Sequence, residues 1–120
     1  MAEWDEPEVD PYYALMDLVD GGRKTEAVYK SSPPFHDFLD HSNLDETAEE
    51  FRREFDEIVR ELVGALGQPR FMGDRHRTGF PSWSTALQLA IWSFDDDLAG
   101  YLAVHHERRD DPFQLRFGVR

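Results

Sequence analysis

The chain has 120 residues, of which 40% are hydrophobic and 32% are charged, and 25 acidic against 13 basic residues give it a net charge of −12. This length and composition predict one folded domain over residues 1–120, which buries roughly two-thirds of its unfolded surface. The charge disfavours binding to nucleic acid and to anionic membranes, and the absence of cysteine excludes disulfides, thiol catalysis and cysteine-ligated zinc.

The amino terminus has neither a basic start nor an apolar run, and no stretch approaches the roughly 18 apolar residues of a membrane helix. We therefore expect a cytoplasmic protein without a signal peptide. The acidity is uneven: residues 1–20 carry −7 and residues 45–66 carry −5, whereas residues 67–94 carry +2.

A short helix is predicted near the amino terminus. Asp10-Pro11 is a favourable helix start, and Gly21-Gly22 would end a helix over residues 12–20. Residues 24–30 are compatible with either a strand or a helical turn. Residues 1–42 are thus expected to form a helical and irregular amino-terminal segment.

The clearest element is a helix over residues 43–66. Its apolar residues recur in alternating steps of four and three, which places them on one face. Asn43 followed by Glu46 fits a capping box, and Gly67 and Pro69 provide a stop. The buried stripe is expected to contain Leu44, Ala48, Phe51, Phe55, Ile58, Leu62 and Ala65.

After residue 69 the hydrophobic period changes from 3.6 to 2, which predicts antiparallel strands. Three alternating runs cover residues 83–92, 98–105 and 113–120, and a short strand near 70–72 would extend them. Their short polar connections are typical of a meander. The fold class is therefore α+β, with a long amphipathic helix packed on a three- or four-stranded antiparallel meander.

The turn at Asp96-Asp97 predicts the register of the first hairpin. It pairs Ile91 with Leu102 on the face toward the helix, and Trp92 with Tyr101 on the opposite face. Because that opposite face is rich in alanine, we expect it to be covered by the amino-terminal segment or, alternatively, by another protein. The helix is expected to pack on Leu87, Leu89, Leu102, Val104, Leu115 and Phe117.

The sequence contains no convincing catalytic or metal-binding pattern. His36 and His41 each have an aspartate four residues away, but the two histidines would lie about 140° apart on a helix. His105-His106 lies in a predicted strand, where neighbouring side chains point to opposite faces. We therefore expect a non-enzymatic protein with no metal site and no cofactor.

A single acidic, cysteine-free domain with one amphipathic helix followed by an antiparallel meander resembles the small immunity proteins of bacterial toxin systems, in layout and charge over about residues 43–120. The resemblance implies a stoichiometric inhibitor that covers a basic protein surface, such as that of a toxin domain. From this sequence, the candidate contacts are the acids Glu46, Glu49, Glu50, Glu54, Glu57, Asp95, Asp96 and Asp97.

A second interpretation belongs to a different class. The domain would be homo-oligomeric, or an adaptor, and would associate through a sheet face that carries Trp92 and Tyr101. The sequence leaves the oligomeric state open.

Overall fold

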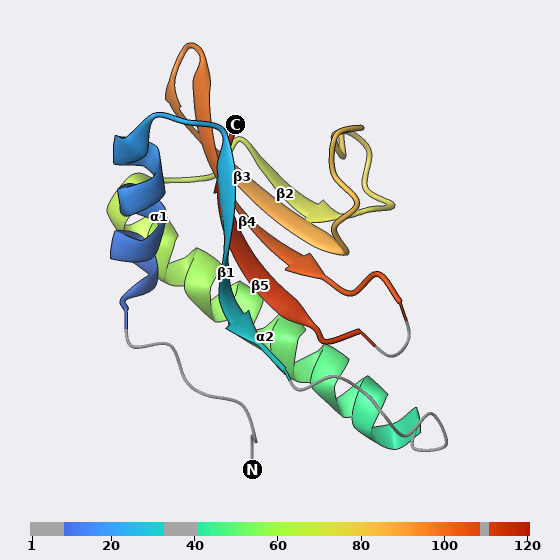
Figure 1. The fold of residues 1–120 in the computed structure, drawn as a ribbon. Coiled ribbons are helices and arrows are strands. Elements are labelled where there is room, and N and C mark those ends of the chain that lie inside the picture. The colour runs from blue at the N-terminus through green and yellow to red at the C-terminus, as the bar shows by residue number, and fades with distance from the viewer. Residues whose placement is uncertain (1–8, 33–40, 109–110) are drawn as a thin grey trace.

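The computed structural model describes residues 9–32, 41–108 and 111–120, and it has two helices and one five-stranded antiparallel sheet (Figure 1). The α+β class predicted from the sequence is confirmed. Strands β2 to β5 form a four-stranded meander, and β1 pairs with β5, which gives the order β1-β5-β4-β3-β2. The elements are α1 (Pro11–Gly21), β1 (Thr25–Ser31), α2 (His41–Leu66), β2 (Phe71–Asp74), β3 (Gln88–Asp95), β4 (Leu98–His105) and β5 (Gln114–Val119).

Helix α1 begins and ends where the sequence predicts. The Asp10 carboxylate accepts a hydrogen bond from the backbone N–H of Tyr12 at 2.9 Å, and Pro11 occupies the first turn. At the other end Gly22 adopts a left-handed φ of 66° and donates its N–H to the carbonyl of Val19. The segment over residues 24–30, for which the sequence allowed a strand or a helical turn, lies almost entirely in strand β1.

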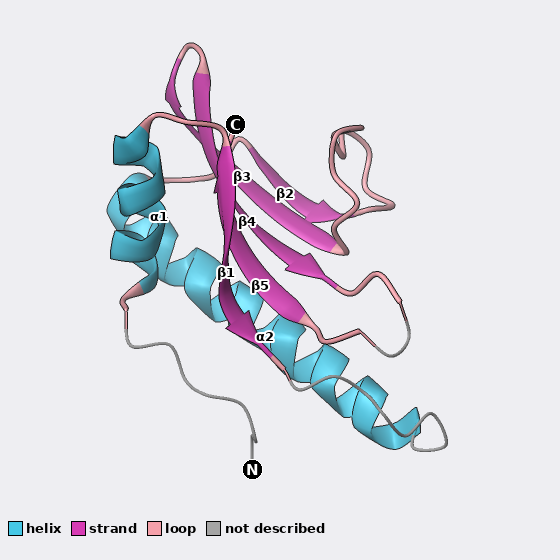
Figure 2. Cartoon of the chain, viewed as in Figure 1, coloured by secondary structure: helices cyan, strands magenta, loops and turns pink. Residues whose placement is uncertain are grey.

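Helix α2 begins at His41, two residues before the predicted start, so Asn43 lies inside the helix and the predicted capping box is wrong. The predicted apolar stripe from Leu44 to Leu62 is nevertheless buried or half-buried, with Phe51, Phe55 and Leu62 among the most enclosed side chains of the protein. Ala65 is exposed, so its predicted burial is wrong. The helix runs obliquely across one face of the sheet (Figure 2).

Helix α1 packs on the same face of the sheet as α2. Leu15 and Val19 belong to the apolar cluster that contains Phe51 and Leu102, and α1 contacts β4, β5 and α2. The expectation that the amino-terminal segment covers the opposite face is therefore wrong for α1, and residues 1–8 lie outside the described part of the chain.

The opposite face is instead partly covered by the connection between β2 and β3. Phe80 and Trp83 pack against a cluster that includes Leu89 and Tyr101, and the Trp83 and Tyr101 ring centroids lie 5.2 Å apart. The strand predicted from residue 83 therefore starts only at Gln88, because the preceding residues fold back over the sheet.

The predicted register of the β3–β4 hairpin is wrong beyond its turn, because β3 contains a bulge. Asp95 pairs with Leu98 as a two-residue turn requires, but the register shifts between Ser93 and Asp95. One extra residue exchanges the faces of everything upstream in β3. Ile91 therefore lies opposite Tyr101, and Trp92 opposite Gly100.

The exchange of faces changes the composition of the core. Ala90 and Trp92 lie in the cluster beneath the helices, whereas Leu89 lies in the cluster on the opposite face. The predicted packing of Leu89 against α2 is wrong. The remaining predicted contacts of α2 are found in its cluster: Leu87, Leu102, Val104, Leu115 and Phe117.

Candidate functional site

The outward face of α2 carries many exposed carboxylates. Four glutamates fall within a sector of about 60° around the helix axis, because they are spaced by four, seven and four residues. Three arginines and the other exposed acids occupy the neighbouring sector, where they partly neutralise one another. We call the first group the glutamate stripe: Glu46, Glu50, Glu57 and Glu61.

Two of the predicted contact acids are already paired within the protein. Glu49 forms an exposed ion pair with Arg52 one helical turn away, and the hydrogen bond from Arg52 lowers the pKa of Glu49. Glu54 forms an ion pair with Lys30, in which Nζ of Lys30 lies 2.6 Å from Oε2 of Glu54. The Lys30 side chain is only 4% exposed. A register shift in β1 between Val28 and Lys30 accompanies this contact. Glu54 therefore joins α2 to β1 and is not a free surface charge.

Charge is segregated between the two layers of the fold. In residues 10–22 and 41–66, which contain both helices, eleven acids stand against three arginines. In residues 23–32, 67–108 and 111–120, which contain the strands and their loops, nine bases stand against seven acids. Over the described residues, the helical layer thus carries −8 and the remainder +2.

The three aspartates of the β3–β4 hairpin lie at its exposed tip. Asp95 accepts a hydrogen bond of 3.2 Å from the backbone N–H of Asp97, which is how aspartate stabilises a turn. The tip and the first turns of α2 lie at opposite ends of the molecule (Figure 1). The structure therefore does not join Asp95, Asp96 and Asp97 to Glu46 in one surface.

Trp92 and Tyr101 lie on opposite faces of the sheet. Trp92 is 3% exposed beneath the helices, and its indole N–H donates to the carbonyl of Gly67 at 2.9 Å. Tyr101 belongs to the cluster on the other face. The single face bearing both residues, on which the self-association interpretation depended, is not formed.

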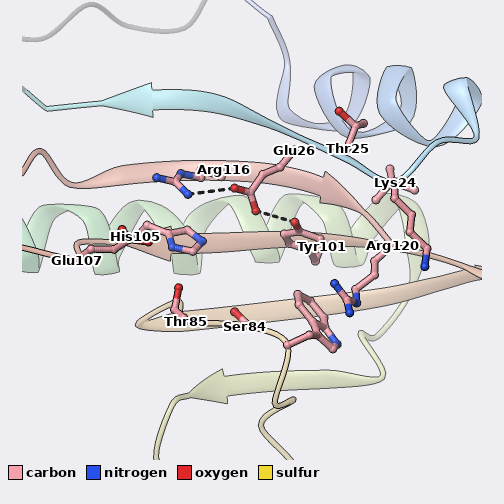
Figure 3. A pocket seen from close by; sticks show the side chains of 12 residues that line it. Lys24, Thr25, Glu26, Ser84, Thr85, Tyr101, His105, Glu107, Arg116 and Arg120 are labelled. Atoms are coloured by element: carbon pink, nitrogen blue, oxygen red, sulfur yellow. Dashed lines mark hydrogen bonds and ion pairs between the residues drawn. The ribbon is translucent and has the colours of Figure 1, made fainter.

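On the sheet face opposite the helices, the part that the β2–β3 connection leaves open forms a polar groove (Figure 3). This groove is not among the sites predicted from the sequence. Its volume is about 390 Å³. Tyr101 and His105 of β4 lie along its floor, Glu26 and Arg116 come from β1 and β5, and Ser84 and Thr85 face them from the β2–β3 connection. Alternation of polar and apolar residues in β5 could have indicated a solvated face, but no spacing connects it to Glu26.

A partly exposed hydrogen-bond network forms one wall of this groove. The Tyr101 hydroxyl donates to one oxygen of Glu26 at 2.6 Å, and Arg116 donates to the other at 3.0 Å. Arg116 also donates to Gln114 at 2.9 Å. A Cβ atom at Gly118 would lie 2.1 Å from the Tyr101 ring, so glycine is required for this close approach. Burial, and then the Glu26 carboxylate, raise the pKa of Tyr101.

His105 is a buried histidine with an unused ring nitrogen. The residue is 7% exposed, and within the described chain its Nδ1 has no hydrogen-bond partner. Burial, followed by the nearby charge of Arg116, lowers the pKa of His105 below its ordinary value of 6.5. The imidazole is therefore neutral near pH 7, and Nδ1 is an enclosed polar atom that forms no hydrogen bond within the described chain.

His105 should make stability depend on pH. Because its folded-state pKa is lowered, the unfolded state binds more protons below about pH 6.5, and the contribution of neutral His105 is lost as the pH falls. Urea unfolding of the parent and of His105→Gln, at about pH 7.5 and about pH 5.5, measures this. The parent should lose more free energy of unfolding between the two pH values than the variant does, and equal losses would contradict the expectation.

We expect the purified protein to hold no stoichiometric zinc, nickel or iron. Within the described part of the chain, no group of three His, Asp or Glu side chains could hold a metal ion. The two histidines of the sequence pair, His36 and His41, lie outside the part of the chain whose side chains the structure describes. Elemental analysis is the measurement, and one tightly held ion per chain that is lost in His36→Ala would contradict the prediction.

Compared with known proteins, the chain matches no protein-family model, no curated protein and no solved structure. Among the helices described, none is long and apolar enough to span a membrane.

Proposed function

We propose that this domain is a non-enzymatic binding protein that uses the outward face of α2 to cover a basic surface of a protein partner. The observation that supports the proposal is the glutamate stripe, whose four exposed carboxylates share one sector of the helix. An immunity-type inhibitor of a toxin domain is the form of this function that the resemblance in layout and charge implies.

The glutamate stripe can attract the basic side chains of a partner protein. Within the described chain, Glu50, Glu57 and Glu61 form no ion pair, so their charges are not already compensated by a direct contact. The helical layer as a whole carries −8 over the described residues, which adds a long-range field of the same sign. A basic surface would therefore be steered toward α2 rather than toward the sheet.

Affinity capture from a lysate of the native host, with parent protein and with Glu50→Lys/Glu57→Lys, tests the proposal. The proposal expects a basic protein identified by mass spectrometry, released by high salt, and absent from the charge-reversed bait. The same basic protein should then bind the parent at a 1:1 ratio when both are purified. A captured partner that is acidic, or that is retained equally by both baits, would contradict it.

A further inference from the structure

We infer that the groove on the open sheet face binds the carboxyl terminus of a short peptide, with the terminal carboxylate at Arg120 and Lys24 and the peptide running along β4 toward His105. This site lies on the face of the sheet opposite the helices, so it is separate from the proposed α2 surface.

The carboxylate end of the groove is defined by Arg120. Its guanidinium carbon lies 4.5 Å from the centroid of the Trp83 ring, a cation–π contact that places the guanidinium group beside the groove. Planar N–H pairs of this kind bind carboxylates with two parallel hydrogen bonds. Lys24 lines the same end of the groove and adds a second positive charge (Figure 3).

The acid in the groove wall does not cancel this attraction. Both oxygens of Glu26 are already occupied, one by the Tyr101 hydroxyl and the other by Arg116. Among the lining side chains, three bases stand against two acids, whereas the side chains of the whole protein sum to −12. A ligand with one carboxylate fits this balance better than a polyanion does, because the second acid, Glu107, would repel further negative charge.

His105 and two hydroxyl side chains line the other end of the groove. The Nδ1 of His105 is enclosed by the protein and does not itself contact the ligand, so polar recognition at this end comes from the hydroxyls. The backbone of a peptide offers both N–H and C=O groups at regular intervals, and the hydroxyls of Ser84 and Thr85 line the opposite side. Glu107 lies beyond His105, so a peptide is expected to point its carboxylate away from this end (Figure 3).

The length of the groove sets the length of the ligand. Tyr101 pairs with Gly118 and His105 pairs with Gln114, so these two rows are four residues apart along the strands. At about 3.3 Å per residue, they are separated by roughly 13 Å, which an extended peptide of about four residues covers.

Titration of isotope-labelled protein, followed by amide NMR signals, tests the inference with tetra-alanine as the probe. Tetra-alanine with a free carboxyl terminus should shift the signals of Tyr101, His105 and Arg120. Its carboxyl-terminal amide should bind at least about ten-fold more weakly, because the bidentate contact is lost. Arg120→Gln and the exposed Lys24→Gln should each reduce this preference, whereas the control Arg53→Gln on α2 should leave it unchanged.

Three results would overturn the inference. They are equal affinity for the free acid and the amide, signal shifts confined to residues outside the groove, and no saturable binding of either peptide. Acetate is the further probe that separates a peptide site from a simple anion site. If acetate binds Arg120 as tightly as tetra-alanine does, the groove recognises an anion alone and the peptide assignment is wrong. Two variants at different positions guard against misfolding, which melting curves of both would reveal.

Discussion

Replacing Phe55 with alanine should lower the free energy of unfolding by about 3–5 kcal/mol. Phe55 lies near the middle of the apolar stripe of α2 and is 1% exposed. Its ring is part of the cluster that holds both helices against the sheet, so truncation removes buried apolar surface and leaves a cavity beneath the longest helix. A loss of this size is a large share of the total stability of a domain of this length.

Two matched variants separate the cavity from other effects of the substitution. Phe55→Leu keeps most of the volume and should cost clearly less than Phe55→Ala. Tyr13→Ala removes an aromatic ring that is 64% exposed on α1, and it should change stability by less than about 1 kcal/mol. Urea unfolding measures the free energy of unfolding of all three variants, and thermal unfolding measures their melting temperatures. If Phe55→Ala melts within about two degrees of the parent, the packing of α2 on the sheet is not what stabilises the domain.

Elements whose local signals agree with each other are predicted well from the sequence. Helix α1 has a capping aspartate, a proline in its first turn and a left-handed glycine at its end, and all three act as expected. The apolar stripe of α2 likewise follows directly from burial on one face. Strand β4 is largely apolar because both of its faces are buried. These patterns are local, so one sequence suffices to recognise them.

The errors arise where a single residue or a distant contact decides the structure. One extra residue at Phe94 exchanges the two faces of β3, and a period-2 pattern with apolar residues on both faces gives no sign of it. Trp92 therefore goes under the helices although its neighbours alternate regularly. The connection before Gln88 also alternates, but it folds over the sheet instead of extending β3.

The groove could not be predicted because its parts are far apart in the chain. Glu26 meets Tyr101 across 75 residues and Arg116 across 90, and these contacts require the pairing of β5 with both β1 and β4. The exposed acids of α2 are different, since their positions follow from helix periodicity alone. Most of the acidic surface is therefore predictable from the sequence, whereas the ion pair between Lys30 and Glu54 is not, because it joins two separate elements.

Reversing the charge of two stripe residues, in Glu50→Lys/Glu57→Lys, should slow association with a basic partner many-fold while leaving folding nearly intact. Both side chains are exposed, and within the described chain neither forms an ion pair, so their contribution to stability is small. Their contribution to encounter is larger, because opposite charges attract over the Debye length, which shrinks from about 30 Å at 0.01 M salt to about 3 Å at 1 M. The association rate of the variant should therefore be lower than that of the parent at low salt, and the two rates should converge at high salt.

The matched control reverses two exposed acids of α1, in Asp17→Lys/Asp20→Lys, and changes the net charge of the protein by the same amount. If the stripe is the contact surface, this control should slow association less than the α2 variant, and the dissociation rate should change only for the α2 variant. Equal slowing by both variants would mean that the partner responds to total charge and not to the stripe. Rates that depend on neither salt nor substitution would remove the acidic face of α2 from consideration as the binding surface.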